Sequence, residues 1–226
     1  MSAHPRDDFF TLIHKGLRGG MLDLYLEAGR LDWHDAEAVA DFRRRWATLS
    51  MLLRSHAHHE DDFIWPLIES KRPGTIAELG VSHEPVDADL GVVDAVLADV
   101  VRDPTPQKGL TFYRALGWFT ADMLDHFAAE EPAITEMLWA HCTDAELGEC
   151  RGRFMSSMNP EEAAGGFTLI LRHSTHAEQV AVIGGMHASM PPEAFTGWVE
   201  GMAASLDPDT ERGLRGLVTE VAAAAV

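Results

Sequence analysis

The sequence predicts an all-α protein, with an antiparallel four-helix bundle over residues 7–141 and a C-terminal helical extension over residues 142–226. Alanine, leucine and methionine are abundant and only two tyrosines occur, a composition that favours helices over strands. Apolar residues recur at helical spacing in four long segments joined by short connections, which is the pattern of an up-down bundle.

Start and stop signals mark the four long helices. We expect them to run from Asp7–Asp8 to Gly29, from Asp35 to Trp65, from Ser82 through residues 88–101, and from Pro106 to His141. Pro66 should stop the second helix, whereas Pro85 falls in the first turn of the third and is tolerated there. Pro132 lies inside the fourth helix, where it removes a hydrogen bond and is expected to kink the helix.

The extension contains shorter amphipathic segments with clear caps. Thr143 with Glu146, and Thr175 with Glu178, have the spacing of capping boxes. Asn159-Pro160 and Asp207-Pro208 each place a capping residue before a proline at the first helical position. The expected helices cover residues 144–157, 160–172, 176–188, 192–204 and 208–222.

Charge and cysteine content restrict the function classes. The chain has 36 acidic and 18 basic residues, a formal net charge of -18, which disfavours nucleic acid and anionic membranes as partners. Cys142 and Cys150 are too few for a disulfide framework. We find no signal peptide and no apolar run long enough to span a membrane, so we expect a cytoplasmic protein.

Histidine and glutamate recur in a repeated pattern. His56 and Glu60 are four residues apart on the second helix, as are His126 and Glu130 on the fourth, so each pair lies on one helical face. A lone histidine precedes each pair on the previous helix: His14 by 42 residues and His83 by 43. Two copies of one pattern indicate a metal site far more strongly than one copy would.

These residue types suit two metal ions in a bundle core. Imidazoles supply neutral nitrogen ligands, and carboxylates can bridge two cations and offset their charge. If both glutamates bridge, each ion has two nitrogens and two oxygens, and an oxo, hydroxo or water bridge leaves one position open. Iron and manganese, or a mixed centre, all fit such ligands.

The order H…HxxxE…H…HxxxE resembles the hemerythrin-like HHE family, over residues 7 to about 141. Pro66, six residues after Glu60, resembles the acidic-aromatic-proline ending of that family's second helix. The resemblance implies a non-heme diiron bundle. It makes His14, His56, His83 and His126 terminal ligands and Glu60 and Glu130 bridging ligands.

Two departures separate this chain from the oxygen-carrying hemerythrins. Those proteins have a fifth histidine in an HxxxH motif on the third helix, where this chain has Asp87 four residues after His83. They also use HxxxxD where this chain has HxxxE. Fewer histidine ligands leave more open coordination, which favours redox chemistry over reversible oxygen carriage.

Several nearby residues are weighed as additional site residues. His59 is expected on the helix flank rather than as an extra ligand. For Asp87 a hydrogen bond to a ligand imidazole and a surface position are equally weighted. Asp61, Asp62 and Glu131 directly follow the ligand glutamates, and we expect them to face solvent or partner cations.

Two main functions follow. In the first, a diiron oxidoreductase consumes O2 or peroxide, with Glu60 and Glu130 as the catalytic carboxylates and a small organic molecule as a further substrate. In the second, the protein senses or stores O2, NO or iron without turnover, and the extension responds to occupancy. A third hypothesis is a purely structural metal site. Separately, an apolar helix of the extension is compatible with a homodimer.

Overall fold

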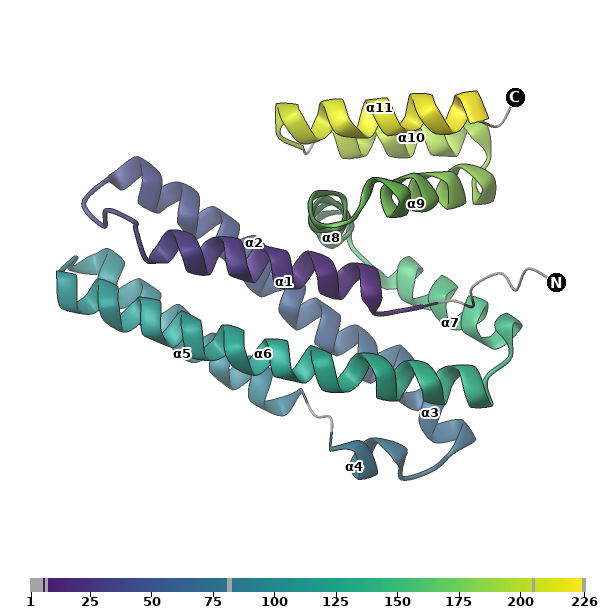
Figure 1. Cartoon of the computed structure of the whole chain (residues 1–226), viewed down its shortest axis with the longest axis horizontal. Coiled ribbons are helices and arrows are strands. Elements are labelled where there is room, and N and C mark those ends of the chain that lie inside the picture. Colours follow the sequence, from purple (N-terminus) through teal and green to yellow (C-terminus); the bar gives the residue numbers. More distant parts are fainter. Residues whose placement is uncertain (1–5, 7, 81–82, 205, 225–226) are drawn as a thin grey trace. The chain divides into compact units, whose positions relative to one another are not determined.

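The computed structural model describes residue 6 and residues 8–80, 83–204 and 206–224, and every regular element among them is a helix (Figure 1). The all-α prediction is therefore confirmed. The helices are α1 (Thr11–Ala28), α2 (Ala36–His59), the π-helical turn η1 (Glu60–Ile64), α3 (Trp65–Lys71), α4 (Thr75–Leu79), α5 (Glu84–Arg102), α6 (Pro106–His141), α7 (Asp144–Ser157), α8 (Pro160–His173), α9 (His176–Ser189), α10 (Pro192–Ala203) and α11 (Pro208–Ala224). The chain divides into two compact units between Met158 and Asn159.

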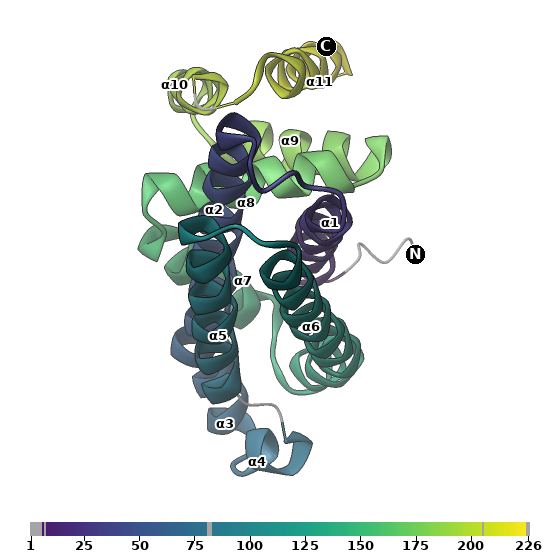
Figure 2. The ribbon, with the colours of Figure 1, turned by 90° about the vertical axis from the view of Figure 1, so that its left-hand side faces the viewer.

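In the first unit, α1, α2, α5 and α6 pack in a closed cycle. Both α1 and α5 pack against α2 and α6, and Figure 2 shows the four helices side by side. Large side chains with almost no exposed surface fill the interior: Leu17, Met21, Phe42, Leu53, Leu90, Phe112, Leu116 and Phe127. Burial of this apolar surface is the main force holding the helices together.

The ends of the long helices follow from their caps. The Asp8 carboxylate accepts hydrogen bonds from the backbone N–H groups of Phe10 and Thr11, so α1 begins at Thr11. Asp35 caps α2 in the same way. The expected starts at Asp7 and Ser82 lie outside the described residues. α6 has the expected bounds and runs as one helix across Pro132 (Figure 1).

The expected end of the second helix at Trp65 is wrong. α2 gives way to the π turn at Glu60, and helical structure then continues through α3 to Lys71. An α-helical turn before Pro66 would press its ring against the carbonyl group four residues earlier, and the wider π turn relieves that clash. Pro66 thus lies in the first turn of α3, where its missing N–H costs little.

α7 belongs to the first unit. Its Leu147 and Cys150 are buried in a cluster with Phe10, Ile64 and Trp65, and the Cys150 thiol contacts the Phe63 carbonyl oxygen at 3.5 Å. The first unit therefore reaches Met158, beyond residue 141, where we expect the bundle to end.

The second unit contains α8 to α11 around its own core. α11 packs against α8, α9 and α10, over buried side chains that include Leu171, Ile183, Phe195, Val199 and Leu214.

The predicted caps of the shorter helices are confirmed. Thr143, Asn159 and Thr175 form capping boxes, and the Asp207 carboxylate accepts hydrogen bonds from the first turn of α11. No helix of the described part of the chain is long and apolar enough to span a membrane.

Candidate metal centre

The six residues of the repeated pattern meet inside the first unit. They come from five elements: His14 from α1, His56 from the last turn of α2, Glu60 from η1, His83 from the N-cap of α5, and His126 and Glu130 from α6. Glu60 and Glu130 are almost completely buried, at 1% and 0% exposed. Helical spacing therefore places the residues as predicted, and the packing of the helices brings both copies of the pattern to one place.

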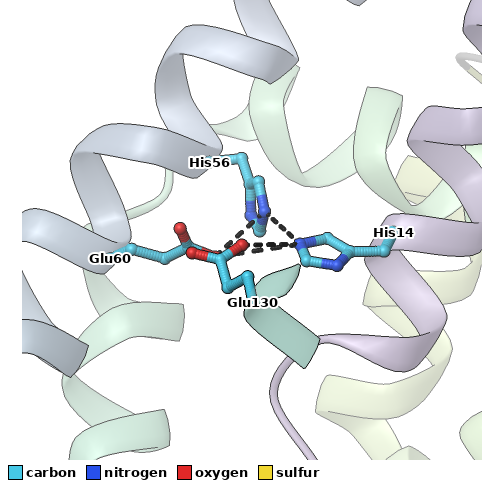
Figure 3. A group of neighbouring side chains, drawn as sticks. All are labelled: His14, His56, Glu60 and Glu130. Atoms are coloured by element: carbon cyan, nitrogen blue, oxygen red, sulfur yellow. Dashed lines mark hydrogen bonds and ion pairs between the residues drawn. The ribbon is translucent and has the colours of Figure 1, made fainter. Parts of the chain in front are cut away.

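Ligand atoms form two overlapping groups. The first contains His14, His56, Glu60 and Glu130, and the second contains His83, His126 and Glu130, with the atoms of each group within 4.8 Å of one another. Figure 3 shows the first group, its imidazole and carboxylate groups directed toward one another. This clustering is what two metal positions with a shared carboxylate require.

Both glutamates face the two histidine pairs at once. Glu60 Oε1 lies 3.0 Å from His56 Nε2, while its Oε2 lies 3.0 Å from His83 Nε2. Glu130 Oε2 lies 3.6 Å from Nε2 of both His14 and His126, and its Oε1 lies 3.8 Å from His83 Nε2. Glu60 thus has one oxygen toward each histidine pair, and Glu130 Oε2 lies equally close to both pairs, so both carboxylates are placed to bridge two ions.

The buried polar atoms point at a common space rather than at hydrogen-bond partners. All four oxygens of Glu60 and Glu130, and His83 Nε2, are buried without a hydrogen bond of good geometry to any described residue, although the closest nitrogen–oxygen pairs among them are 3.0 Å apart. His14 Nε2 and His56 Nε2 lie only 2.7 Å apart. Unsatisfied buried carboxylates are costly, and two cations would satisfy them. The residues therefore fit a dinuclear metal site.

Protonation differs among the four histidines. Burial, together with the neighbouring His56 and Arg18, holds the pKa of His14 far below its usual range. Burial and nearby histidines lower the pKa of His56 to about 3, and burial lowers that of His126.

His83 and Glu60 shift in the opposite direction. Burial alone would lower the pKa of His83, but adjacent carboxylates, Glu130 and Glu60 foremost, raise it to about 10. Burial and the neighbouring Glu130 raise the pKa of Glu60 well above its ordinary value. Without a metal, His83 and Glu60 therefore tend to retain their protons.

Two acidic residues behave differently from our expectation. Asp61 Oδ1 accepts a hydrogen bond from His83 Nδ1 at 2.9 Å, and Glu131 Oε1 accepts one from His14 Nδ1 at 3.0 Å. Arg18 Nη1 pairs with the same Glu131 oxygen at 2.5 Å. Asp61 is half exposed and Glu131 pairs with a cation, as expected, but we did not expect the hydrogen bonds to the ligand histidines. The sequence signal that could have predicted these contacts is that each residue directly follows a ligand glutamate.

The other candidates lie outside both groups. Asp87 is 54% exposed and lies 3.5 Å from Arg54 Nε and from His58 Nε2, so it has the surface position. His59 contacts Ser55 Oγ at 3.3 Å, and its ring packs edge-on against Phe154 of α7. The helix-flank interpretation of His59 is confirmed.

Aromatic rings shield the lone histidines from water. Phe127 stacks on His14 with a centroid distance of 4.0 Å, and Trp65 stacks on His83 at 5.6 Å. Both rings are buried. An apolar wall on each side restricts solvent access and strengthens the electrostatic interactions within the site.

Comparison with known families agrees with this geometry. The family model of the hemerythrin HHE cation binding domain matches residues 7–138, a stretch that includes all six clustered residues. The chain belongs to the hemerythrin HHE cation-binding family. A search of curated proteins and one of solved structures gave no significant match. Membership in the hemerythrin HHE family carries cation binding with it, and the His/Glu cluster is the part of the described chain suited to hold the cation.

Proposed function

We propose that the first unit is a four-helix bundle holding two iron ions, and that the protein is an oxidoreductase acting on O2 or peroxide. His14 and His56 would bind one iron, His83 and His126 the other, and Glu60 and Glu130 would bridge them. The observation that carries the proposal is the set of four buried carboxylate oxygens without hydrogen bonds, located between two histidine pairs.

Bound iron would pass electrons from a reducing substrate to O2 or peroxide, and would supply the open coordination positions that this reaction requires. The protein would supply the rest. Glu60 and Glu130 hold the two positions at a fixed spacing, and the Phe127 and Trp65 rings keep the site dry. Asp61 and Glu131 accept hydrogen bonds from Nδ1 of His83 and His14.

The position of Asp87 favours turnover over oxygen carriage. It stands where oxygen-carrying hemerythrins have their fifth histidine, and its side chain is turned to Arg54 at the surface. With two nitrogen ligands per ion, more coordination remains open for a small ligand such as O2, peroxide or NO. A small organic molecule is a candidate second substrate.

The test begins with metal analysis and optical spectra of protein from iron-supplemented cells, before and after dithionite, air and peroxide. We expect about two irons per chain, as the two ligand groups require, with bands that bleach on reduction. His56→Ala and Glu130→Ala should lose iron, whereas His58→Ala, on an exposed side chain, should keep it. Full iron content in either ligand variant, or manganese or zinc in place of iron, contradicts the diiron assignment.

The alternative is a sensor or store for O2, NO or iron without turnover, and the second unit with its own core is the observation that favours it. Repeated consumption of O2 or peroxide per centre supports the enzyme, whereas stoichiometric, reversible uptake supports the alternative. A chain ending at Met158 keeps α7 with the first unit. Turnover by this shorter chain would show that α8 to α11 are not part of the catalytic pocket. A cytoplasmic location and a homodimer remain predictions.

A further inference from the structure

The two halves of the repeat are connected through their outer hydrogen bonds. His14 belongs to the first half, but its Nδ1 donates to Glu131, which follows Glu130 of the second half. His83 belongs to the second half, but its Nδ1 donates to Asp61, which follows Glu60 of the first half. Each lone histidine is therefore held by the residue next to the glutamate of the other half.

We propose that Asp61 and Glu131 are positioning residues, each fixing the lone histidine of the opposite repeat with Nε2 toward the metal. The inference rests on the proposed metal site. An ionised carboxylate can only accept hydrogen bonds, so the imidazole nitrogen that faces it must carry the proton. The other nitrogen, Nε2, is then the one available as a ligand once the ring is neutral.

The backbone explains why two unlike turns produce the same arrangement. Glu131 continues the α-helix after Glu130, and reaches His14 because α1 and α6 pack together. Asp61 is the second residue of the π turn that begins at Glu60, and the turn is where the chain must accommodate Pro66. π turns occur frequently at functional sites. Here the turn carries a ligand and, next to it, the acceptor for another ligand.

The two contacts differ in their surroundings. Glu131 also pairs with Arg18, and its side chain is 28% exposed, whereas Asp61 is 46% exposed and has His83 as its ion-pair partner among the described residues. Arg18 in turn lies 5.4 Å from the centre of the Phe127 ring that stacks on His14. Glu131 is thus held from two sides, and Asp61 from one.

The first measurement compares the full chain with four variants. Asp61→Ala and Glu131→Ala remove the acceptors, while Asp62→Ala and Glu136→Ala change exposed neighbours on the same elements. In metal-free protein, NMR of the imidazole N–H groups should show exchange-protected Nδ1 protons on His14 and His83. We expect Asp61→Ala to remove the protection at His83 alone, and Glu131→Ala at His14 alone. The controls should change neither.

Metal affinity is the second measurement, by competition of Fe²⁺ under anaerobic conditions against a chelator. Loss of such an outer hydrogen bond typically weakens metal binding about 10- to 100-fold, and we expect this for both variants. Asp61→Asn keeps a neutral acceptor oxygen and should restore the His83 proton signal and part of the affinity, which separates positioning from a general folding defect.

Failure of the inference and failure of the proposed function give different results. If the wild-type chain binds no iron but the crosswise loss of Nδ1 protection is seen, the diiron proposal fails while the positioning contacts stand. If the chain binds two irons and neither variant changes the proton signals or the affinity, the positioning inference is overturned.

Discussion

The two lone histidines come from the same sequence pattern, but their pKa values shift in opposite directions when no metal is bound. His14 and His56 have lowered pKa values because burial and neighbouring positive groups oppose protonation. His83 has a raised pKa because the carboxylates around it outweigh the effect of burial. The comparison shows that sequence spacing places the ligands, whereas the groups facing each histidine determine whether it is unprotonated and able to bind a metal.

Arg18 is one source of this difference. Each lone histidine contacts a carboxylate at about the same distance, 3.0 Å for His14 and 2.9 Å for His83. Arg18 shares the carboxylate beside His14, and its positive charge contributes to the lowered pKa of that histidine. The two histidine–carboxylate contacts have similar lengths, but the arginine in α1 makes protonation less favourable at His14 than at His83.

The largest effect should come from Glu130→Gln, because Glu130 belongs to both ligand groups. We expect the variant to lose iron from both positions. In metal-free protein it should instead increase the free energy of unfolding, by about 1–3 kcal/mol, because one of two adjacent buried carboxylates is removed. Iron analysis and urea unfolding with and without iron measure the two effects. Glu136→Gln on the exposed face of α6 is the control, and wild-type iron content in Glu130→Gln would contradict the shared role.

The next effect is on pH dependence, where His56 and His83 should act in opposite directions. The lowered pKa of His56 makes metal-free protein lose stability as the pH falls from about 6.5 toward 3, because the unfolded chain takes up the proton first. The raised pKa of His83 contributes stability below about pH 6.5, which is lost as the pH rises toward 10. The raised pKa of Glu60 acts in the same direction as that of His83.

The pH dependence of metal affinity should follow the titration of His83. Iron must displace the proton of His83, so the affinity should rise about tenfold per pH unit for each proton released, between pH 6.5 and 10. Calorimetry with Zn²⁺, which avoids oxidation, in buffers of different ionisation enthalpy counts these protons. Binding at pH 7 without proton release would show that His83 is uncharged like His14, and the proposed difference between the two lone histidines would be wrong.

Much of this site could be predicted from local sequence, because its main geometry is local. The four-residue spacing of His56 with Glu60 and of His126 with Glu130 places each pair on one face whatever surrounds the helix. Caps such as Thr175 are equally local, and they were predicted correctly. Repetition then indicated that both pairs serve one site.

The remaining features depend on contacts between distant segments. The π turn depends on how Pro66 is accommodated in a packed helix, and helical periodicity carries no sign of it. The contacts of Asp61 and Glu131 join residues 22 and 117 positions apart, so they appear only when the helices pack. The pKa differences arise from burial and from facing charges, which the repeated motif alone cannot distinguish.

The smallest effect is expected for Asp87→Asn, which asks whether the carboxylate that orients His83 comes from its own helix or from the other half of the repeat. Asp87 is the aspartate one turn after His83, but it is half exposed and paired with Arg54. Exposed ion pairs of this kind contribute about 0–1 kcal/mol. We therefore expect unchanged iron content, an unchanged His83 proton signal and a stability within about 1 kcal/mol of wild type, measured by urea unfolding. A tenfold loss of metal affinity in Asp87→Asn, with none in Asp61→Asn, would instead assign the orienting carboxylate to α5 and make the second half self-contained.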